Sequence, residues 1–403
     1  MNIIRDLAIT AVASFLLLLP LLGLRLSDTG TVLTVMPDGL LLMQGVAVAL
    51  LLRGLYWLLK PQAAKLSIVF RLPTRTTGII LFIVAAIFPF LPFTDRYLLD
   101  IATLVLTYIL LAWGLNITIG MTGLLDLGYV AFYAIGAYAY ALLALNLGIG
   151  FWLALPVSML VAMLASFIVG IPTLRLRGDY FAIATLGFAE IVRIIVTNWQ
   201  SLTGGPNGLS RIPRPALFDL SFDRVPPDGM RGFAETFGLE FDAIHRVIML
   251  YYIGLTMAML LLLGIRWLRR LPLGRAMEAV REDEIAAASV GINVARVKIM
   301  AYALSSAIGA LAGAFFAARQ GFISPESFTF METAVILAVV VLGGAGSMLG
   351  PVLGAAVLIG VPELFRDLQD YRMLAFGAGM VALMVWRPGG MFALRRPQAR
   401  LAP

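Results

Sequence analysis

The stretch YLLDIATLVLTYILLAWGLNITIGMTGLLDLG, residues 97–128, shows how this chain is built. Residues 97–117 form an almost continuous apolar run, and a helix needs about 20 such residues to cross the hydrocarbon core of a bilayer. Glycines at 114, 120 and 123 then interrupt the run. The stretch predicts a membrane-spanning helix that is broken near one end.

The composition of the whole chain extends this prediction. Of 403 residues, 61% are apolar and 13% are charged, whereas soluble domains have about 45–50% and about 25%. This apolar content suffices for roughly twelve crossings of about 20 residues each. The absence of cysteine excludes disulfides and thiol chemistry, and a single histidine argues against a metal site of the usual kind. We expect an all-α polytopic membrane protein that binds no metal and no cofactor of its own.

Apolar runs between charged or Gly/Pro-marked breaks predict the individual spans. Lys and Arg gather in the segments on one side of these spans, which places both termini in the cytoplasm by the positive-inside rule. The net charge of +7 is then a signal of topology, and the chain is expected to meet a lipid bilayer rather than nucleic acid. The twelve predicted spans are 8–24, 39–59, 78–93, 97–117, 129–147, 151–173, 180–197, 247–266, 299–318, 330–346, 350–366 and 372–386.

Two longer polar segments remain. Residues 198–245 are expected outside the cell, and residues 267–298 in the cytoplasm. Residues 275–290 contain no Gly or Pro, and Met277, Val280 and Ile285 recur near helical spacing, which predicts one short amphipathic helix. We expect its apolar stripe to dock on the membrane surface or on a partner protein. Its mixed charge favours the partner, since helices that lie on lipid carry a strongly basic face.

Part of this helix resembles a known motif. The pattern Ala286-Ala287-x-x-x-Gly291 is similar to the EAA loop of ABC-importer permeases, although Ile285 stands where the general pattern has Glu. The longer string 274–291 resembles the branched-chain amino acid permease family more closely. The further stretches that are similar to this family are 114–138, 176–187 and 342–351.

The resemblance implies a permease core at 96–390 and a cytoplasmic tail at 391–403. The N-terminal extension at 1–95, with about three spans, resembles the LivM branch of the family. Such a permease works in the bacterial inner membrane with a homologous permease subunit, two ATP-binding subunits that hold the ATP and Mg²⁺, and a periplasmic or extracellular solute-binding protein. The implied function is import of leucine, isoleucine or valine by alternating access.

The resemblance also implies two contact sites. The sequence TGGPNGL at 203–209 opens the external segment and would touch the binding protein, although Gly-Pro and Asn-Gly are also simple turn formers. The implied binding-protein contacts are Thr203, Gly204, Gly205 and Asn207. The implied ATPase-coupling residues are Gly274, Arg275, Glu278, Arg281, Glu284, Ala286, Ala287 and Gly291.

Glycine-interrupted hydrophobic segments in two related halves predict the translocation pathway. The alternative is close helix packing through small residues, which needs no ligand. Asn116 and Asp126 favour a functional role for the first cluster, although Asp126 lies near a predicted span end and could be a solvated carboxylate. The predicted pathway residues are Asn116, Gly120, Gly123, Asp126, Gly128, Thr185, Glu190, Arg193, Gly343, Gly344 and Gly346.

Glu190 and Arg193 are ionisable residues inside a predicted span, three positions apart, so that they share a helix face. They would offer complementary charges to a zwitterionic amino acid, or they simply neutralise each other. Two other functions stay open. One is import of urea or short amides by the same type of transporter. The other is an ion-coupled secondary carrier that relies on Glu190 and Arg193 and has no use for the 275–291 helix. A membrane enzyme is disfavoured, because the sequence offers no convergent acid cluster.

Overall fold

The computed structural model describes residues 74–364, with gaps at 93, 174–175, 177, 217–219, 223–230, 234–235, 237 and 239–241, together with residues 24–28, 33–37, 43 and 377. The chain divides into two compact units, Met1–Ile80 and Leu81–Pro403. In the first unit, strand β1 (Leu24–Asp28) pairs antiparallel with β2 (Leu33–Pro37). The pair lies in the connection between the predicted spans 8–24 and 39–59, in a chain that was predicted to be all-α. The predicted spans 8–24, 39–59 and 372–386 lie almost wholly outside the described residues.

Six described helices are long and apolar enough to cross a membrane. They agree with six predicted spans to within a few residues, and they include the span that contains Glu190 and Arg193. The chain is therefore a mostly helical, polytopic membrane protein. The six are α4 (Arg96–Asn116), α5 (Tyr129–Leu147), α6 (Phe151–Thr173), α7 (Asp179–Asn198), α10 (Ala243–Arg270) and α13 (Val294–Gln320).

Three further predicted spans are shorter or interrupted in the structure. Helix α14 has 14 residues, and at 1.5 Å per residue its length of about 21 Å is less than the roughly 30 Å of a hydrocarbon core. The corresponding elements are α3 (Thr74–Ile87) with η1 (Phe88–Phe90), α14 (Phe330–Gly343), and α15 (Gly350–Ala355) followed by η5 (Ala356–Gly360) and α16 (Val361–Leu364).

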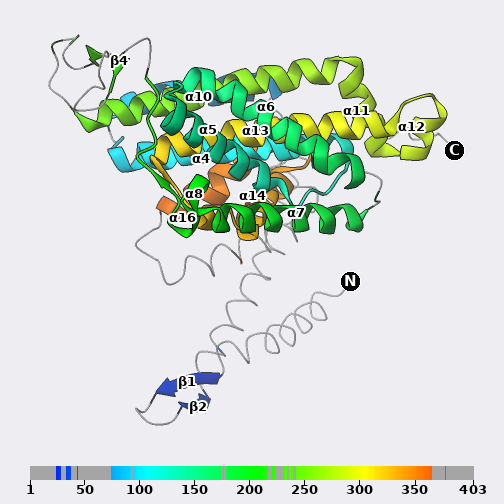
Figure 1. Cartoon of the computed structure of the whole chain (residues 1–403), viewed down its shortest axis with the longest axis horizontal. Coiled ribbons are helices and arrows are strands. Elements are labelled where there is room, and N and C mark those ends of the chain that lie inside the picture. Colours follow the sequence, from blue (N-terminus) through cyan, green and yellow to red (C-terminus); the bar gives the residue numbers. More distant parts are fainter. Residues whose placement is uncertain are drawn as a thin grey trace. The chain divides into compact units, whose positions relative to one another are not determined.

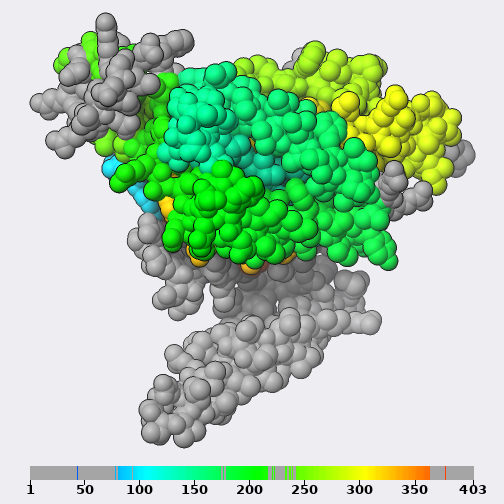
Figure 2. Space-filling model, in the orientation of Figure 1, coloured from blue at the N-terminus to red at the C-terminus, as the bar shows by residue number. Residues whose placement is uncertain are grey.

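Helix α13 runs through the middle of the second unit and packs against α4, α5 and α6 (Figure 1). Small residues let the backbones approach closely: a Cβ on Gly136 would overlap the backbone of Ala310, and a Cβ on Gly313 would overlap that of Tyr133. Close approach of this kind stabilises helix pairs where lipid removes the hydrophobic driving force. Figure 2 shows α6 and α7 covering much of one face, and α6 exposes apolar side chains such as Ile168 (76% exposed).

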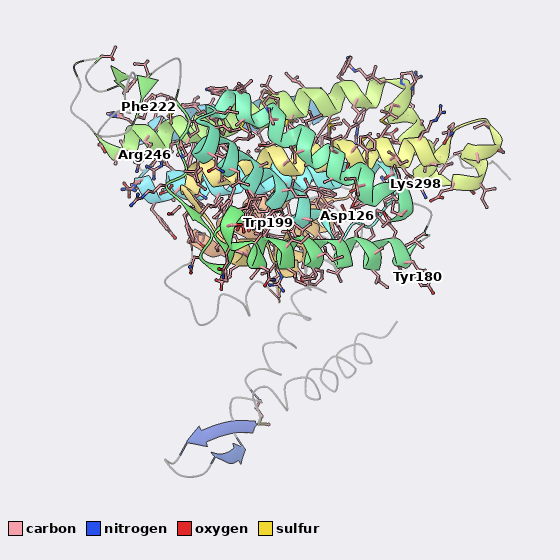
Figure 3. All side chains as sticks on the ribbon, in the orientation of Figure 1. Asp126, Tyr180, Trp199, Phe222, Arg246 and Lys298 are labelled. Carbon is pink, nitrogen blue, oxygen red and sulfur yellow. The ribbon has the colours of Figure 1, made fainter. Side chains whose placement is uncertain are left out.

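The two long polar segments lie at opposite ends of the helices. Figure 3 places Lys298 and Tyr180 near one end, and Phe222 and Arg246 near the other. The segment after α7 contains α8 (Gln200–Thr203), η3 (Gly205–Asn207), β3 (Leu209–Ser210), and the pair β4 (Leu220–Ser221) with β5 (Arg231–Gly232). Strand β3 pairs with β6 (Phe322–Ile323), which follows α13. The described residues of these two segments thus lie at opposite ends of the helices, as the predicted topology requires.

The segment predicted as one helix at 275–290 forms two, α11 (Pro272–Glu282) and α12 (Glu284–Ser289). The single-helix prediction is wrong because Asp283 is extended (φ −160°) and its carboxylate accepts the amide hydrogens of Ile285 and Ala286, at 2.8 and 3.0 Å. Aspartate is among the best residues for starting a helix in this way.

The expectation that the apolar stripe docks on the membrane surface or on a partner is wrong for two of its three residues. Met277 and Val280 are buried within the chain itself, whereas Ile285 is 79% exposed. The break at Asp283 therefore separates an inward-facing helix α11 from a helix α12 that presents an apolar residue to its surroundings.

A test of the close packing compares two helical glycines. In Gly120→Ala, the new Cβ would overlap the Asn116 amide and lie 2.8 Å from the Gly346 Cα, so we expect a loss of about 1–3 kcal/mol, typical of overpacking. Gly187→Ala is the matched control, because nothing lies within 4 Å of its Cβ, and it should gain stability by about 0.5–1 kcal/mol. Thermal unfolding in detergent measures both, and equal melting temperatures would contradict the packing.

Candidate functional site

Asn116 joins the two glycine clusters that lie far apart in the sequence. Its Nδ2 donates to the Ser347 carbonyl at 2.9 Å, and its Oδ1 accepts from the Gly346 amide at 2.7 Å. The Trp113 indole adds a bond to the Met348 carbonyl at 2.8 Å. We call the two segments, 116–123 and 343–350, the glycine junction.

Both segments of the junction interrupt a helix. Helix α4 passes into the π-helical turn η2 (Ile117–Thr122), which Gly123 ends at φ 73°. Helix α14 ends at Gly343, and the next turn uses Gly344 and Gly346 at φ 111° and 86°. Such φ values are accessible mainly to glycine. Of the five glycines that were predicted for the pathway and lie in this junction, three (Gly123, Gly344 and Gly346) are therefore needed because of their positive φ angles.

Close packing accounts for the other two. The backbone of Gly346 crosses directly over Gly120, and Gly343 lies against the backbone of Gly350, so a side chain at either position would collide. The Asn116 side chain is itself 5% exposed. The structure thus brings the two predicted clusters together, and it supports the packing interpretation for Gly120 and Gly343.

Two arginines of the 267–298 segment form hydrogen bonds with the glycine junction. Arg281 of α11 donates to the Gly120 carbonyl, and Arg269 of α10 donates to the Gly346 carbonyl. Carbonyls in the last turn of a helix lack intrahelical partners, so Arg281 satisfies an acceptor at the end of η2, and Arg269 satisfies a carbonyl of the loop that follows α14. The 267–298 segment is in this way bonded to both halves of the junction.

Asp126, Gly128 and Thr185 form a second contact, between the α4–α5 connection and α7. Asp126 is fully buried, so its interpretation as a solvated carboxylate is wrong. Its Oδ1 accepts the Gly128 amide at 2.9 Å, and the Thr185 hydroxyl accepts the Leu127 amide at 3.2 Å. Burial raises the pKa of this carboxyl, which lies outside the two flanking spans, to about 6.

No group of three or more His, Asp or Glu side chains able to hold a metal occurs among the described residues.

An ion pair fastens α12 to the start of α13. The Lys298 Nζ lies 2.6 Å from the Glu284 Oε1, and the lysine side chain is only 5% exposed. Glu284, predicted as a coupling residue, thus has a partner within the chain. Of the other predicted coupling residues, Gly274 and Ala287 are buried, Arg281 is half-buried at the junction, and Arg275, Glu278, Ala286 and Gly291 are exposed.

The predicted pairing of Glu190 with Arg193 is confirmed. The Arg193 Nε lies 2.9 Å from the Glu190 Oε2, with the side chains 41% and 39% exposed. Arg193 also lines a small apolar cavity between α5, α7 and η4 (Pro325–Phe328). The pair lies on α7. It is distant from the glycine junction in the sequence and shares no hydrogen bond with it among the described residues.

The TGGPNGL segment is partly built into the fold. Thr203 is buried and its hydroxyl donates to the Val196 and Trp199 carbonyls, while Gly205 is buried as well. Gly204 takes φ 73° at the end of α8. Asn207 remains exposed. The turn interpretation therefore explains three of the four predicted binding-protein contacts, and Asn207 is the one left free for a partner.

Several polar residues of the structure were missed by sequence reasoning. Arg269 and Lys298 stand at the ends of apolar runs, where they were read only as topology signals. Asp100 and Glu332 lie inside predicted spans, and Arg319 lies directly after one. Glu190 and Arg193 were selected because ionisable residues within spans are candidates for a functional site, and the same criterion could have found these three.

Comparison with known proteins gives the class of protein. The sequence profile described as "Branched-chain amino acid transport system / permease component" matches residues 97–384. The chain therefore belongs to this family of membrane permease components. No solved structure gives a significant match.

Two of the similar proteins are LivM, the permease protein of the high-affinity branched-chain amino acid transport system, from Escherichia coli K12 and from Salmonella typhimurium LT2. Each is 51% identical over 322 residues, which cover 80% of this chain and 75% of the relative. The autoinducer 2 import permease LsrC of Yersinia enterocolitica is 29% identical over 76% of this chain and 81% of its own.

The ion pair of Lys298 offers a local test. Lys298→Met keeps a long side chain in the buried position but removes the bond to Glu284, so α12 should loosen while the fold persists. We expect amides 284–290 to exchange hydrogen about tenfold faster, as the loss of roughly 1.4 kcal/mol implies. Arg296→Met, an exposed position on the same helix, is the control. Unchanged exchange in Lys298→Met would show that the ion pair does not hold α12.

Proposed function

We propose that this chain is the membrane-spanning permease subunit of an ABC importer for branched-chain amino acids. The observation that supports this most is the bonding of Arg281 and Arg269 to the two helix breaks. A permease without its own ATPase needs a segment that passes a partner's movement to the membrane helices, and residues 267–298 have the contacts for this task.

The proposed route of coupling has three steps. Closure of the two ATP-binding subunits moves the α11–α12 segment. Arg281 and Arg269 pass that movement to the Gly120 and Gly346 carbonyls, and Asn116 keeps both segments of the junction moving together. The half-helices on either side of the junction then open the pathway toward one side of the membrane at a time.

The structure suggests where an ATP-binding subunit would dock. Ile285 and Val290 are 79% and 76% exposed at the end of the segment, and Asp283 and Lys298 hold α12 in place beneath them. Beside them, an open groove is lined by Leu273, Arg275, Ala276, Ile292, Asn293 and Arg296. In this proposal Ile285 and Val290, rather than the buried Ala287, are the main apolar contacts.

The remaining predictions enter the proposal as follows. The chain has twelve spans with both termini in the cytoplasm, and it lies in the bacterial inner membrane as the extension 1–95, the core 96–390 and the tail 391–403. It pairs with a homologous permease, and the ATP and Mg²⁺ are bound by the two ATP-binding subunits. A solute-binding protein on the outer side touches the exposed Asn207.

The substrate is proposed from the relatives. The two LivM proteins, 51% identical to this chain, are named for branched-chain amino acids, whereas LsrC is more distant and imports autoinducer 2. Urea or short amides remain the alternative solutes for the same architecture. An ion-coupled carrier is disfavoured because it would give no role to the two arginines that bond the 267–298 segment to the glycine junction.

Arg281→Gln and Arg269→Gln test the coupling route. Each removes a charge-assisted hydrogen bond, so we expect leucine uptake to fall about tenfold or more, while the ATP-binding subunits still co-purify with the permease. Arg270→Gln, an exposed neighbour, should leave uptake unchanged. The assay is uptake of labelled leucine into cells whose own copy of this chain has been replaced, and normal uptake by both variants would exclude this route.

Ile285→Asp and Val290→Asp test the docking surface. Both side chains are exposed, so the variants should insert into the membrane normally but lose the co-purifying ATP-binding subunits, because a carboxylate would be buried unpaired in the contact. Ile285→Leu and Val290→Ile keep the apolar surface and should retain the subunits. Retention by the Asp variants would move the docking surface elsewhere, and uptake without any bound ATPase would favour the carrier.

A further inference from the structure

A cluster of opposite charges lies at or near the ends of three helices, away from the glycine junction. Arg319 is in the last turn of α13, Glu332 in the first turn of α14, and Asp100 in α4. All three side chains are partly buried. Charged groups within apolar helices cost free energy and usually mark a functional site.

The Asp100 carboxylate attracts the Arg319 guanidinium electrostatically, but these two described side chains form no ion pair. Arg319 donates to the backbone carbonyl of Asp100 at 3.2 Å, and the Tyr108 side chain lies next to the Glu332 carboxyl. Among the described residues, no ion pair joins Arg319 to Glu332 or to Asp100. Glu190 and Arg193, by contrast, neutralise each other. Arg319 and Glu332 are therefore not joined in an ion pair that a third molecule would have to break.

Aromatic and aliphatic side chains border the cluster. Tyr133 lies close to Glu332 and Arg319, and its ring packs against Phe316 and Phe328 with centroids 5.4 and 5.1 Å apart. Phe328 also forms one wall of the small cavity that Val130, Ala134, Ala189 and Val192 line. An apolar group attached to a head group in the cluster would thus meet an apolar surface.

From this arrangement we propose that Arg319 and Glu332 bind the head group of an α-amino acid on its way through the permease. Arg319 binds the carboxylate in the planar geometry that guanidinium favours, and Glu332, with Asp100 nearby, binds the ammonium group. Tyr133 and Phe328 contact the aliphatic side chain, for which the cavity beside them must widen. This inference rests on the proposed function and names the substrate class and its contacts.

A purely structural role is the competing interpretation. A cation in the last turn of one helix and an anion in the first turn of the next both interact favourably with the helix dipoles. That interaction would stabilise the fold but would not depend on a bound amino acid. The two roles therefore differ in how the site responds to a ligand, and this difference decides the experiment.

The probe is photo-leucine, a diazirine analogue of leucine, added to the purified full-length chain with its co-purifying subunits in lipid nanodiscs. After irradiation, mass spectrometry locates the label. We expect it on the peptides that contain Tyr133, Phe316 or Phe328. Leucine should compete, whereas isoamylamine, which lacks the carboxylate, and 4-methylpentanoate, which lacks the ammonium group, should not.

Substitutions then assign the charges. Arg319→Gln and Glu332→Gln should each lower labelling about tenfold, and Glu326→Gln, an exposed carboxylate nearby, should leave it unchanged. Size-exclusion profiles check folding. If Arg319→Gln fails to fold, the labelling of the isosteric variant Glu332→Gln is the test of the proposed site.

The inference is overturned if the label lies elsewhere, if Glu332→Gln labels like the unaltered chain, or if either analogue competes as well as leucine. Its failure can be told from that of the proposed function, because the same preparations report bound ATP-binding subunits. Bound subunits without label at this site would remove the inference and leave the importer. Label at this site without subunits, in cells that still take up leucine, would support the inference and remove the importer.

Discussion

The side-chain amide of Asn116 is the interaction on which the described core depends. Helices that stop inside an apolar environment leave backbone groups that no water can satisfy, and each such group costs free energy. Asn116 offers a donor and an acceptor on one planar group, and it uses both on the loop after α14, at Ser347 and Gly346. One buried side chain therefore satisfies two backbone groups at the break after α14 and ties that break to the end of α4.

The glycines follow from this constraint. Once the loop at Gly346 lies against Asn116, its backbone also crosses Gly120, and there is no room for a side chain there. The positive φ angles of Gly344 and Gly346 then turn the chain back toward α15. The free carbonyls of Gly120 and Gly346 face Arg281 and Arg269. Packing, backbone conformation and the proposed coupling route are consequences of the same close approach.

The sequence predicted six of the described spans to within a few residues because length and apolarity act locally. It also predicted the Glu190–Arg193 pair, which needs only helical spacing. It could not show that Asn116 meets Gly346, since that contact joins positions far apart in the chain. Nor could it separate glycines that allow close packing from those that take positive φ. The break at Asp283 was visible as a helix-starting residue before a second run of good helix formers, but the apolar positions on either side concealed it.

The inward-facing stripe of α11 changes what the 267–298 segment can do. A helix that rested on a partner alone would move freely against the membrane helices. With Met277 and Val280 buried in the chain and Lys298 paired to Glu284, α11 and α12 are instead a firm extension of α10 and α13. In the proposed importer, a displacement at Ile285 moves the whole extension, and Arg281 and Arg269 carry that movement to the broken helices. In the proposed importer, the firmness of this segment converts closure of a distant ATPase into a shift at Gly120 and Gly346.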